Sequence, residues 1–239
     1  MLADHEVMSR FAAQVVLAAV RRLAAESDGL PLRLVFSAGK TPIRLYELLA
    51  TDYVDEFDWS RVHLYQMDEY VDPPSMDQDF SRYLSDKVIE PLGIGSANLM
   101  IRSHVDGRGG DWKSFIQRHE HHLRRSGGID LVLHGIGSNG HLGFNEPGTA
   151  PTAAGAVVPL TASTRAAAGP IPIATHGVTL GLGVLLAAKE TIVLASGSHK
   201  AQAVAQFLCG PVTSDCPASW LRCCDRVTVA VDAAAAKLL

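Results

Sequence analysis

The spacing of apolar residues along the chain predicts helices and strands in alternation. Residues 4–28 place apolar side chains at the i, i+3, i+4, i+7 positions of an amphipathic helix, with Asp4 as a candidate N-cap and Gly29 beyond its end. A short apolar run at 32–36 then leads through a polar turn into a second helical pattern that begins at Ile43. The local unit is therefore a strand, a turn and a helix.

The same unit recurs along the rest of the 239 residues. Strands are predicted at 62–67, 129–134, 191–196 and 227–231, and helices near 79–91, from about 198 and at the C-terminus. Such alternation is typical of a mostly parallel sheet with helices on both faces. Neither an internal repeat nor a linker rich in Pro, Ser or charge divides the sequence. We expect an α/β, Rossmann-like, doubly wound single domain over residues 1–239, with a short lid at about 149–177.

Composition narrows the class of partner. Hydrophobic residues make up 47% of the chain and charged residues 19%, which excludes intrinsic disorder of the body. A net charge of −4 argues against a nucleic-acid or anionic-membrane surface, and no apolar run is long enough to span a bilayer. We therefore expect a cytoplasmic protein, a monomer or homo-oligomer, with a small-molecule partner. The spacing of the cysteines predicts reduced thiols rather than a metal site: Cys209, Cys216, Cys223 and Cys224.

Ligands of open α/β sheets bind beyond the carboxyl ends of the strands, so the segments that follow the predicted strands are the candidate sites. The first segment is Ser37, Ala38, Gly39, Lys40, Thr41 and Pro42. Thr41 could cap a helix that starts at Pro42, which would leave backbone N–H groups free for an anion, with the charge of Lys40 and the hydroxyl of Ser37 beside them. The alternative is an ordinary capped turn. A Walker A loop is excluded, because it would need glycine at Leu34.

The second segment places two adjacent carboxylates, Asp68 and Glu69, at the end of the apolar strand 62–67. A partly desolvated carboxylate has a raised pKa and can serve as a general base. The alternative is a solvated acidic loop or a helix cap. We expect one of the two side chains to face the cleft.

The third segment, 135–148, follows the strand 129–134 and contains G-x-G-x-x-G. Dinucleotide binding would also need an acidic residue about 20 positions further on, and no Asp or Glu occurs between Glu146 and Glu190. The glycines more simply let the backbone approach a ligand, beside His141 and Glu146. A histidine held by a carboxylate can act as an acid or a base near neutral pH, whereas the alternative is a packed core histidine with a capping glutamate.

Two further groups of residues are weaker candidates. The run 119–122, His-Glu-His-His, is predicted to be the solvated face of an exposed helix, because it lacks the H-E-x-x-H spacing of a zinc site. Lys200 follows the strand 191–196, so it could reach an anion at the same edge of the sheet. The alternative is an exposed lysine.

Taken together, these segments resemble the ordered motifs of the glucosamine-6-phosphate deaminase (isomerase) family over nearly the whole chain. The specific part is G-H-x-x-F-N-E-P at 140–147 together with M-D-E-Y at 67–70. The related 6-phosphogluconolactonases share the fold and the upstream glycine-rich loop but lack the F-N-E-P ending. The same fold also serves as the effector-binding half of some transcription regulators, but no basic DNA-reading stretch precedes Leu32.

The resemblance implies a cofactor-independent enzyme, without a metal, that converts a 2-amino-2-deoxy hexose 6-phosphate into a ketose 6-phosphate and ammonia. It implies that Asp68 moves a proton from C2 to C1 of the open-chain sugar. His141, supported by Glu146 and Asn139, would open the pyranose ring. The sugar phosphate would be bound by Ser37, Ala38, Gly39, Lys40, Thr41, Gly137, Arg165 and Lys200. The alternatives are sugar-lactone hydrolysis, which needs no C2 base, and a non-catalytic sugar-phosphate-binding module.

This chain departs from the family pattern at three points. Many members carry aspartate where this chain has Asn139, and an amide can orient His141 but cannot raise its basicity through charge. The family's lid arginine corresponds to Pro170, so either Lys40 supplies the missing charge or the substrate differs at its phosphate end. The basic cluster and C-terminal extension of allosteric members are absent from the sequence, so we expect no amino-sugar effector site.

Overall fold

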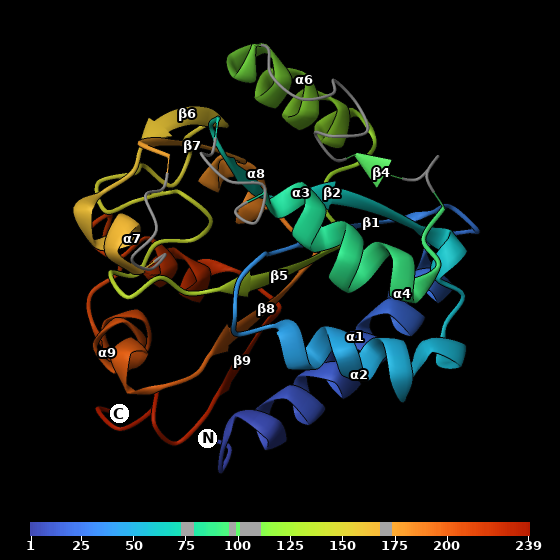
Figure 1. The fold of residues 1–239 in the computed structure, drawn as a ribbon, viewed down its shortest axis with the longest axis horizontal. Helices are drawn as coiled ribbons and strands as arrows, with labels where there is room; N and C mark the ends of the chain where they lie inside the picture. Colours follow the sequence, from blue (N-terminus) through green and yellow to red (C-terminus); the bar gives the residue numbers. More distant parts are fainter. Residues whose placement is uncertain (73–78, 96–98, 101–110, 168–173) are drawn as a thin grey trace.

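The computed structural model describes residues 1–72, 79–95, 99–100, 111–167 and 174–239. Its central sheet is parallel throughout and has the strand order β4-β2-β1-β5-β8-β9 (Figure 1). The strands are β1 (Leu32–Phe36), β2 (Val62–Gln66), β4 (Leu99–Met100), β5 (Leu131–Gly135), β8 (Glu190–Ala195) and β9 (Val227–Val231). The parallel α/β sheet predicted from the sequence is confirmed.

Alternating strand side chains enter separate cores on the two faces of this sheet. Leu34 of β1 belongs to a core built with α1 (His5–Glu26) and α2 (Ile43–Thr51). Its neighbour Val35 belongs to a core on the opposite face, with α6 (Trp112–Arg125). This period-two pattern is the reason why the apolar strand runs need helices on both sides. The sheet is therefore doubly wound, as expected.

Further helical elements complete the two layers. On the side of α1 lies one helical stretch made of α3 (Phe80–Leu84), a π-helical turn (Ser85–Ile89) and α4 (Glu90–Leu92). On the side of α6 lie α8 (Leu182–Leu185) and α9 (Ala201–Cys209). Short 3₁₀ turns occupy Val54–Glu56, Trp59–Arg61, Ser198–Lys200 and Pro217–Cys223. Within the described ranges, no helix combines the length and apolarity needed to cross a membrane.

The order of the strands reverses between β1 and β5. From β1 the chain builds outward to β2 and β4, whereas β5, β8 and β9 extend the sheet in the other direction. At the carboxyl ends of these neighbours, the Ser37 amide donates to the Leu133 carbonyl at 3.1 Å and the Gly135 amide donates to Ser37 Oγ at 3.2 Å. A topological switch point of this kind is where open α/β sheets bind ligands.

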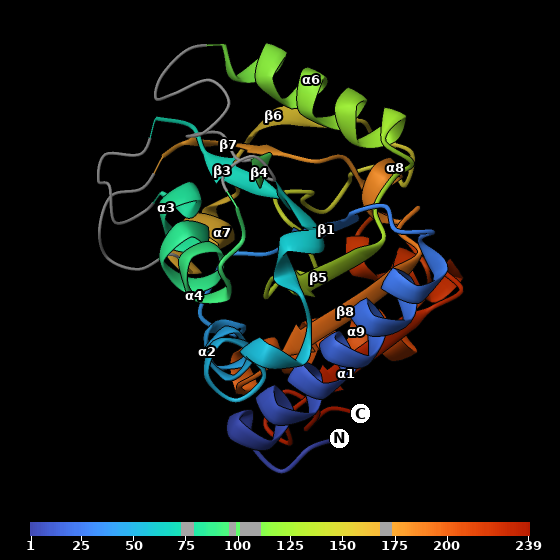
Figure 2. The same cartoon turned by 90° about the vertical axis from the view of Figure 1, so that its right-hand side faces the viewer.

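A second, antiparallel sheet was not predicted from the sequence. It has the order β3-β7-β6 and is made of β3 (Asp68–Tyr70), β7 (His176–Thr179) and β6 (Ala156–Pro159). Figure 2 shows this sheet beneath α6, beyond the end of the central strands. The segment expected as a lid at 149–177 contains β6, α7 (Ala162–Ala167) and the start of β7.

Several local predictions are tested by the described residues. Asp4 caps α1 by accepting from the Val7 amide at 2.9 Å, as predicted, and Gly29 lies beyond the end of that helix. The capping role of Thr41 is wrong, because α2 begins at Ile43, with Pro42 as its N-cap and no side-chain capping bond. The expected C-terminal helix is also wrong: residues 233–238 form turns after β9.

Candidate active site

The loop that follows β5 folds back on itself and brings the ring of His141 over Gly137. The Gly137 amide donates to the His141 carbonyl, and the Gly140 amide donates to the Gly137 carbonyl, both at 3.0 Å. A Cβ added at Gly137 would lie only 2.4 Å from Nε2 of His141. Gly140 has a φ of +85°, a conformation that favours glycine. Gly137 therefore lets the imidazole pack directly on the backbone, and Gly140 supplies the turn before His141.

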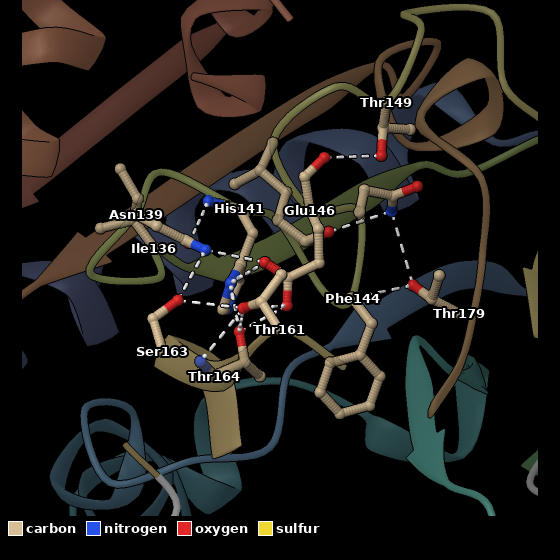
Figure 3. Close-up of polar contacts among 12 residues, drawn as sticks. Ile136, Asn139, His141, Phe144, Glu146, Thr149, Thr161, Ser163, Thr164 and Thr179 are labelled. Atoms are coloured by element: carbon tan, nitrogen blue, oxygen red, sulfur yellow. Dashed lines mark hydrogen bonds and ion pairs between the residues drawn. The ribbon is translucent and has the colours of Figure 1, made fainter. Parts of the chain in front are cut away.

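His141 and Glu146, both in the motif at 140–147, lie side by side with Nδ1 and Oε2 3.3 Å apart (Figure 3). Asn139 Nδ2 donates to the same Oε2 at 2.7 Å, and the Asn139 Oδ1 accepts from the His141 amide at 3.2 Å. Burial alone would raise the pKa of Glu146. Hydrogen bonds from His141, Thr164 and Asn139, together with the His141 charge, outweigh it and lower this pKa to about 2.

Three hydroxyl side chains from the start of α7 surround this pair, and the sequence analysis did not single them out. Thr164 Oγ1 donates to Oε1 of Glu146, and Thr161 Oγ1 lies 3.3 Å from the same oxygen. Ser163 Oγ accepts from Asn139 Nδ2 at 3.3 Å. A short Thr-Ala-Ser-Thr run carries no periodic apolar signal, so only the fold shows that it meets the β5 loop.

Asp68 lies at the start of β3, directly after the end of β2, and it points toward the same loop. A Cβ built at Gly143 would lie 3.5 Å from Oδ2 of Asp68. The side chain is half-buried. Burial, and to a lesser degree the charge of Glu69, raises the pKa of Asp68 to about 8. A carboxylate with this pKa can accept and return a proton near neutral pH.

Glu69, the other candidate carboxylate, is turned away from the loop and buried. Its Oε1 accepts from the amides of Tyr70 and Phe80, both at 2.9 Å. Its Oε2 accepts at 2.8 Å from both the Ser81 amide and the side chain of Gln66. Glu69 therefore ties β3 to the first turn of α3, and Asp68 is the carboxylate left to face the loop.

The Ser37–Thr41 segment is held in place by aromatic hydroxyls beneath it. Tyr46 donates to the Ser37 carbonyl at 2.8 Å, and Tyr83 donates to the Gly39 carbonyl at 2.7 Å. These two hydrogen bonds to backbone carbonyls fix the orientation of the peptide units of the turn. Ser37 is buried and Lys40 is exposed. The turn before α2 is thus a fixed backbone surface at the switch point, which can present amides to an anion.

Lys200 reaches the same region from the turn after β8. Its Nζ donates to the Ile136 carbonyl at 2.6 Å, and burial lowers its pKa. Ser37 accepts from the amide of Gly135, and Lys200 donates to the carbonyl of the next residue, Ile136. These two candidate anion-binding residues therefore contact adjacent positions at the end of β5. At the end of β2, the Gln66 side chain donates to the Asp68 carbonyl at 3.0 Å and to Oε2 of Glu69 at 2.8 Å.

Comparisons with known proteins identify the family of this chain. The model of the family described as glucosamine-6-phosphate isomerases/6-phosphogluconolactonase matches residues 3–230. The chain belongs to this family. It is 37% identical over 214 residues to a glucosamine-6-phosphate deaminase of Halothermothrix orenii, covering 86% of this chain and 87% of the relative. It is 31% identical to glucosamine-6-phosphate deaminase 2 of Bacillus subtilis, covering 100% of this chain and 96% of the relative.

Solved structures of the family share the whole fold. A structure described as a monomeric glucosamine-6-phosphate deaminase aligns with a TM-score of 0.89 at 28% identity, covering 100% of this chain and 99% of the other. A 6-phosphogluconolactonase from Trypanosoma cruzi aligns with a TM-score of 0.81 at 20% identity, covering 100% and 95%. The second similarity concerns the fold alone, so the chemistry of this family member has to be argued from its own residues.

The remaining candidates of the sequence analysis fall at different places. Arg165 lies on α7 and is exposed, and Pro170 is outside the described residues. The predicted exposure of the 119–122 run is wrong for His119 and Glu120, which are buried. His119 Nε2 bonds the Gln66 carbonyl at 2.8 Å, so this side chain anchors α6 to the end of β2. Among the described residues, His, Cys, Asp and Glu side chains form no group of three or more suited to a metal.

Proposed function

We propose that this protein is a cofactor-independent isomerase and deaminase of a 2-amino-2-deoxy hexose 6-phosphate, glucosamine 6-phosphate or a close variant, that releases a ketose 6-phosphate and ammonia. The observation that carries the proposal is the position of Asp68. Its carboxylate, with a pKa raised to about 8, faces the same glycine loop that holds the His141–Glu146 pair. Lactone hydrolysis needs no such base.

The reaction begins with opening of the pyranose ring, for which His141 is suited. Its Nδ1 is directed at Glu146, so Nε2 is available to take the proton of O1 and return it to O5. Glu146, ionised because its pKa is lowered to about 2, stabilises the imidazolium that forms between these two transfers. Asn139 holds Glu146 at Oε2, and Gly137 leaves room for the ring.

The second stage is the aldose to ketose shift on the open chain. Asp68 removes the C2 proton to give an enolamine and returns a proton to C1. A second proton passes from the amino nitrogen to O1, which leaves a ketimine at C2 and a hydroxyl group at C1. Water adds to this ketimine, and the carbon–nitrogen bond breaks to release ammonia. No electrons are gained or lost overall, and one carboxylate is sufficient for the proton transfer between the two carbon atoms. Burial of Asp68 suits it to both tasks, because its pKa lies close to neutral.

We place the phosphate of the substrate against the turn of Ser37, Ala38, Gly39, Lys40 and Thr41, with Gly137 and Lys200 beside it. Support comes from the anchored carbonyls of this turn, from the start of α2, and from the ammonium group of Lys200 at Ile136. Exposed Lys40 and Arg165 are the further cations available to it. We also propose a cytoplasmic monomer or homo-oligomer, acting as one catalytic domain without an amino-sugar effector site.

The test is release of ammonia and formation of ketose phosphate from glucosamine 6-phosphate, galactosamine 6-phosphate and unphosphorylated glucosamine. In deuterated water, the single-base shift also predicts solvent deuterium at C1 of the product. Asp68→Asn should lower kcat by roughly 10²–10⁴-fold, the range of general-base catalysis. Asp86→Asn, which removes an exposed carboxylate 3.7 Å from Arg82, is the matched control. Turnover of 6-phosphogluconolactone alone, unaffected by Asp68→Asn, would overturn the proposal in favour of lactone hydrolysis.

A further inference from the structure

One hydroxyl group contacts both members of the proposed ring-opening pair. Thr164 is buried on α7, where its Oγ1 hydrogen-bonds Oε1 of Glu146 and lies 3.3 Å from Nδ1 of His141 (Figure 3). Thr164 comes from a segment that follows β6, whereas His141 and Glu146 belong to the loop after β5. The pair is therefore complete only when α7 is packed against that loop.

The direction of these hydrogen bonds follows from what each group can donate. Glu146 is ionised, because its pKa is lowered to about 2, and an ionised carboxylate only accepts. The hydroxyl group of Thr164, which has a single proton, therefore donates its hydrogen bond to Glu146. Both neighbours of His141 Nδ1, the Thr164 oxygen and Oε2 of Glu146, are then acceptors. This arrangement favours the tautomer of neutral His141 with its proton on Nδ1 and leaves Nε2 as the proton acceptor.

The local chain fixes the direction of the Thr164 hydroxyl. Thr161 Oγ1 accepts from the Thr164 amide at 3.2 Å, which is the pattern of a helix N-cap. For the single proton of Thr161, Thr164 Oγ1 at 3.0 Å is a closer acceptor than Oε1 of Glu146 at 3.3 Å, so Thr161 donates to Thr164. Because Thr164 Oγ1 accepts this hydrogen bond from Thr161, its own O–H group is directed at Glu146. The hydrogen bonds thus run from Thr161 to Thr164 and from Thr164 to the Glu146 carboxylate.

From this geometry we propose that Thr164 is a positioning residue that orients Glu146 and sets the tautomer of His141, so that ring opening depends on the docking of α7. The inference rests on the proposed function for its catalytic consequence. Its structural part, the position of the His141 proton, can be measured without any substrate.

The test compares Thr164→Val, which keeps the shape but loses the hydroxyl, with Thr164→Ser, which keeps the hydroxyl. On glucosamine 6-phosphate we expect Thr164→Val to lower kcat roughly tenfold, the effect of losing one charge-assisted hydrogen bond, with KM changed by less than about threefold. Thr164→Ser should restore most of kcat. Thr149→Val is the matched control, because the Thr149 hydroxyl binds the backbone carbonyl of Glu146 at 2.7 Å rather than its carboxylate.

The deciding readout is the ¹⁵N NMR spectrum of the histidine rings, with His141 assigned by its loss in His141→Gln. We expect a proton on Nδ1 of His141 in the native protein, in Thr164→Ser and in Thr149→Val, and a larger Nε2–H fraction in folded Thr164→Val. An unchanged tautomer in Thr164→Val would overturn the inference, whatever happens to kcat. Absence of ammonia release by the native protein would instead count against the proposed function and leave this readout intact.

Discussion

The side-chain amide of Asn139 donates to Oε2 of Glu146 at 2.7 Å, and this oxygen also lies 3.3 Å from Nδ1 of His141. At the other end of the same amide, Oδ1 accepts from the His141 backbone N–H at 3.2 Å. Both ends of Asn139 are thus used, and the donating end is the one that contacts a carboxylate. An amide at this position is matched to an ionised neighbour without adding charge.

Many family members carry aspartate at this position, but in this chain the 139 side chain donates to Glu146, so we expect Asn139→Asp to impair the site. A carboxylate at 139 would replace a hydrogen-bond donor by a second negative group beside Oε2 and would raise the pKa of Glu146. We expect kcat to fall roughly tenfold and the free energy of unfolding at pH 7 to fall by about 1–2 kcal/mol. Asn139→Ala, which removes the donor without adding charge, is the control. Equal losses in both variants would contradict the electrostatic explanation.

Gly137 gives a purely steric test of the ring position. Its φ is not in the left-handed region, so alanine meets no backbone strain there, but the added Cβ would lie 2.4 Å from Nε2 of His141. We expect Gly137→Ala to fold, to displace the imidazole, and to lower kcat at least about a hundredfold by misplacing the proton acceptor. A crystal structure and steady-state kinetics would check this.

The control for that variant lies two residues earlier. A Cβ at Gly135 would have no atom within 4 Å, and Gly135 also lacks a positive φ. Gly135→Ala should therefore leave the His141 ring in place in the same crystallographic comparison. If Gly137→Ala also kept the ring in its native position, the close packing of His141 on Gly137 would not be what constrains this loop.

Most of the fold could be predicted because its strands are continuous apolar runs whose ends are marked by glycine and polar turns. The segments at Ser37, Asp68 and His141 could be predicted to lie together for the same reason, since parallel strands place their carboxyl ends at one edge of the sheet. The strand ends at β1, β2 and β5 follow this rule. Periodicity and topology together thus located the candidate site.

The parts that could not be predicted depend on contacts between distant segments. Strand β3 is three residues long, too short for a periodic pattern, and it exists because it pairs with β7. Glu69 is buried because backbone amides of α3 bind it, which residue type alone does not reveal. Likewise Thr164 is a small polar residue in an Ala- and Thr-rich segment, and only the packing of α7 against the β5 loop gives it a role. Long-range hydrogen bonds, rather than local propensity, decide these positions.

The ionisation of Asp68 links activity to stability. Its pKa is raised from 3.8 to about 8, so between these values the folded protein binds a proton that the unfolded chain releases. Stability therefore falls as the pH rises from about 4 to 8. Asp68→Asn cannot ionise, so its stability should depend less on pH and exceed that of the native protein at pH 8. Chemical unfolding at several pH values would check this, and parallel curves for the two proteins would contradict it.

The same pKa predicts the form of the activity profile. Only ionised Asp68 can remove the C2 proton, so kcat/KM of the native protein should rise with pH up to about 8. Asp86→Asn should retain this rise, because Asp86 is exposed and far along the α3–α4 stretch. A kcat/KM that is already maximal at pH 5 would show that Asp68 is ionised there and would contradict the assignment of its pKa.

His134 is the residue at which stability can be gained. It lies in β5, wholly buried, and neither ring nitrogen has a hydrogen-bond partner among the residues that the structure describes. Burial lowers its pKa to about 3, so the folded protein keeps it neutral. The unfolded chain takes up a proton below about pH 6.5, and this residue therefore removes stability as the pH falls from 6.5 toward 3.

We expect His134→Leu to raise the free energy of unfolding by about 1 kcal/mol at pH 7, because it removes an unsatisfied buried polar group of similar size. The gain should grow to about 3 kcal/mol at pH 5, where the unfolded native chain is protonated. His119→Leu is the matched contrast at pH 7: His119 is also buried, but its Nε2 bonds the Gln66 carbonyl at 2.8 Å, so its loss should destabilise the protein there. Because burial lowers the pKa of His119 to about 4, this destabilisation should shrink at pH 5. Urea unfolding of the three proteins at both pH values measures this, and a destabilised His134→Leu would show that the imidazole is bound rather than orphaned in β5.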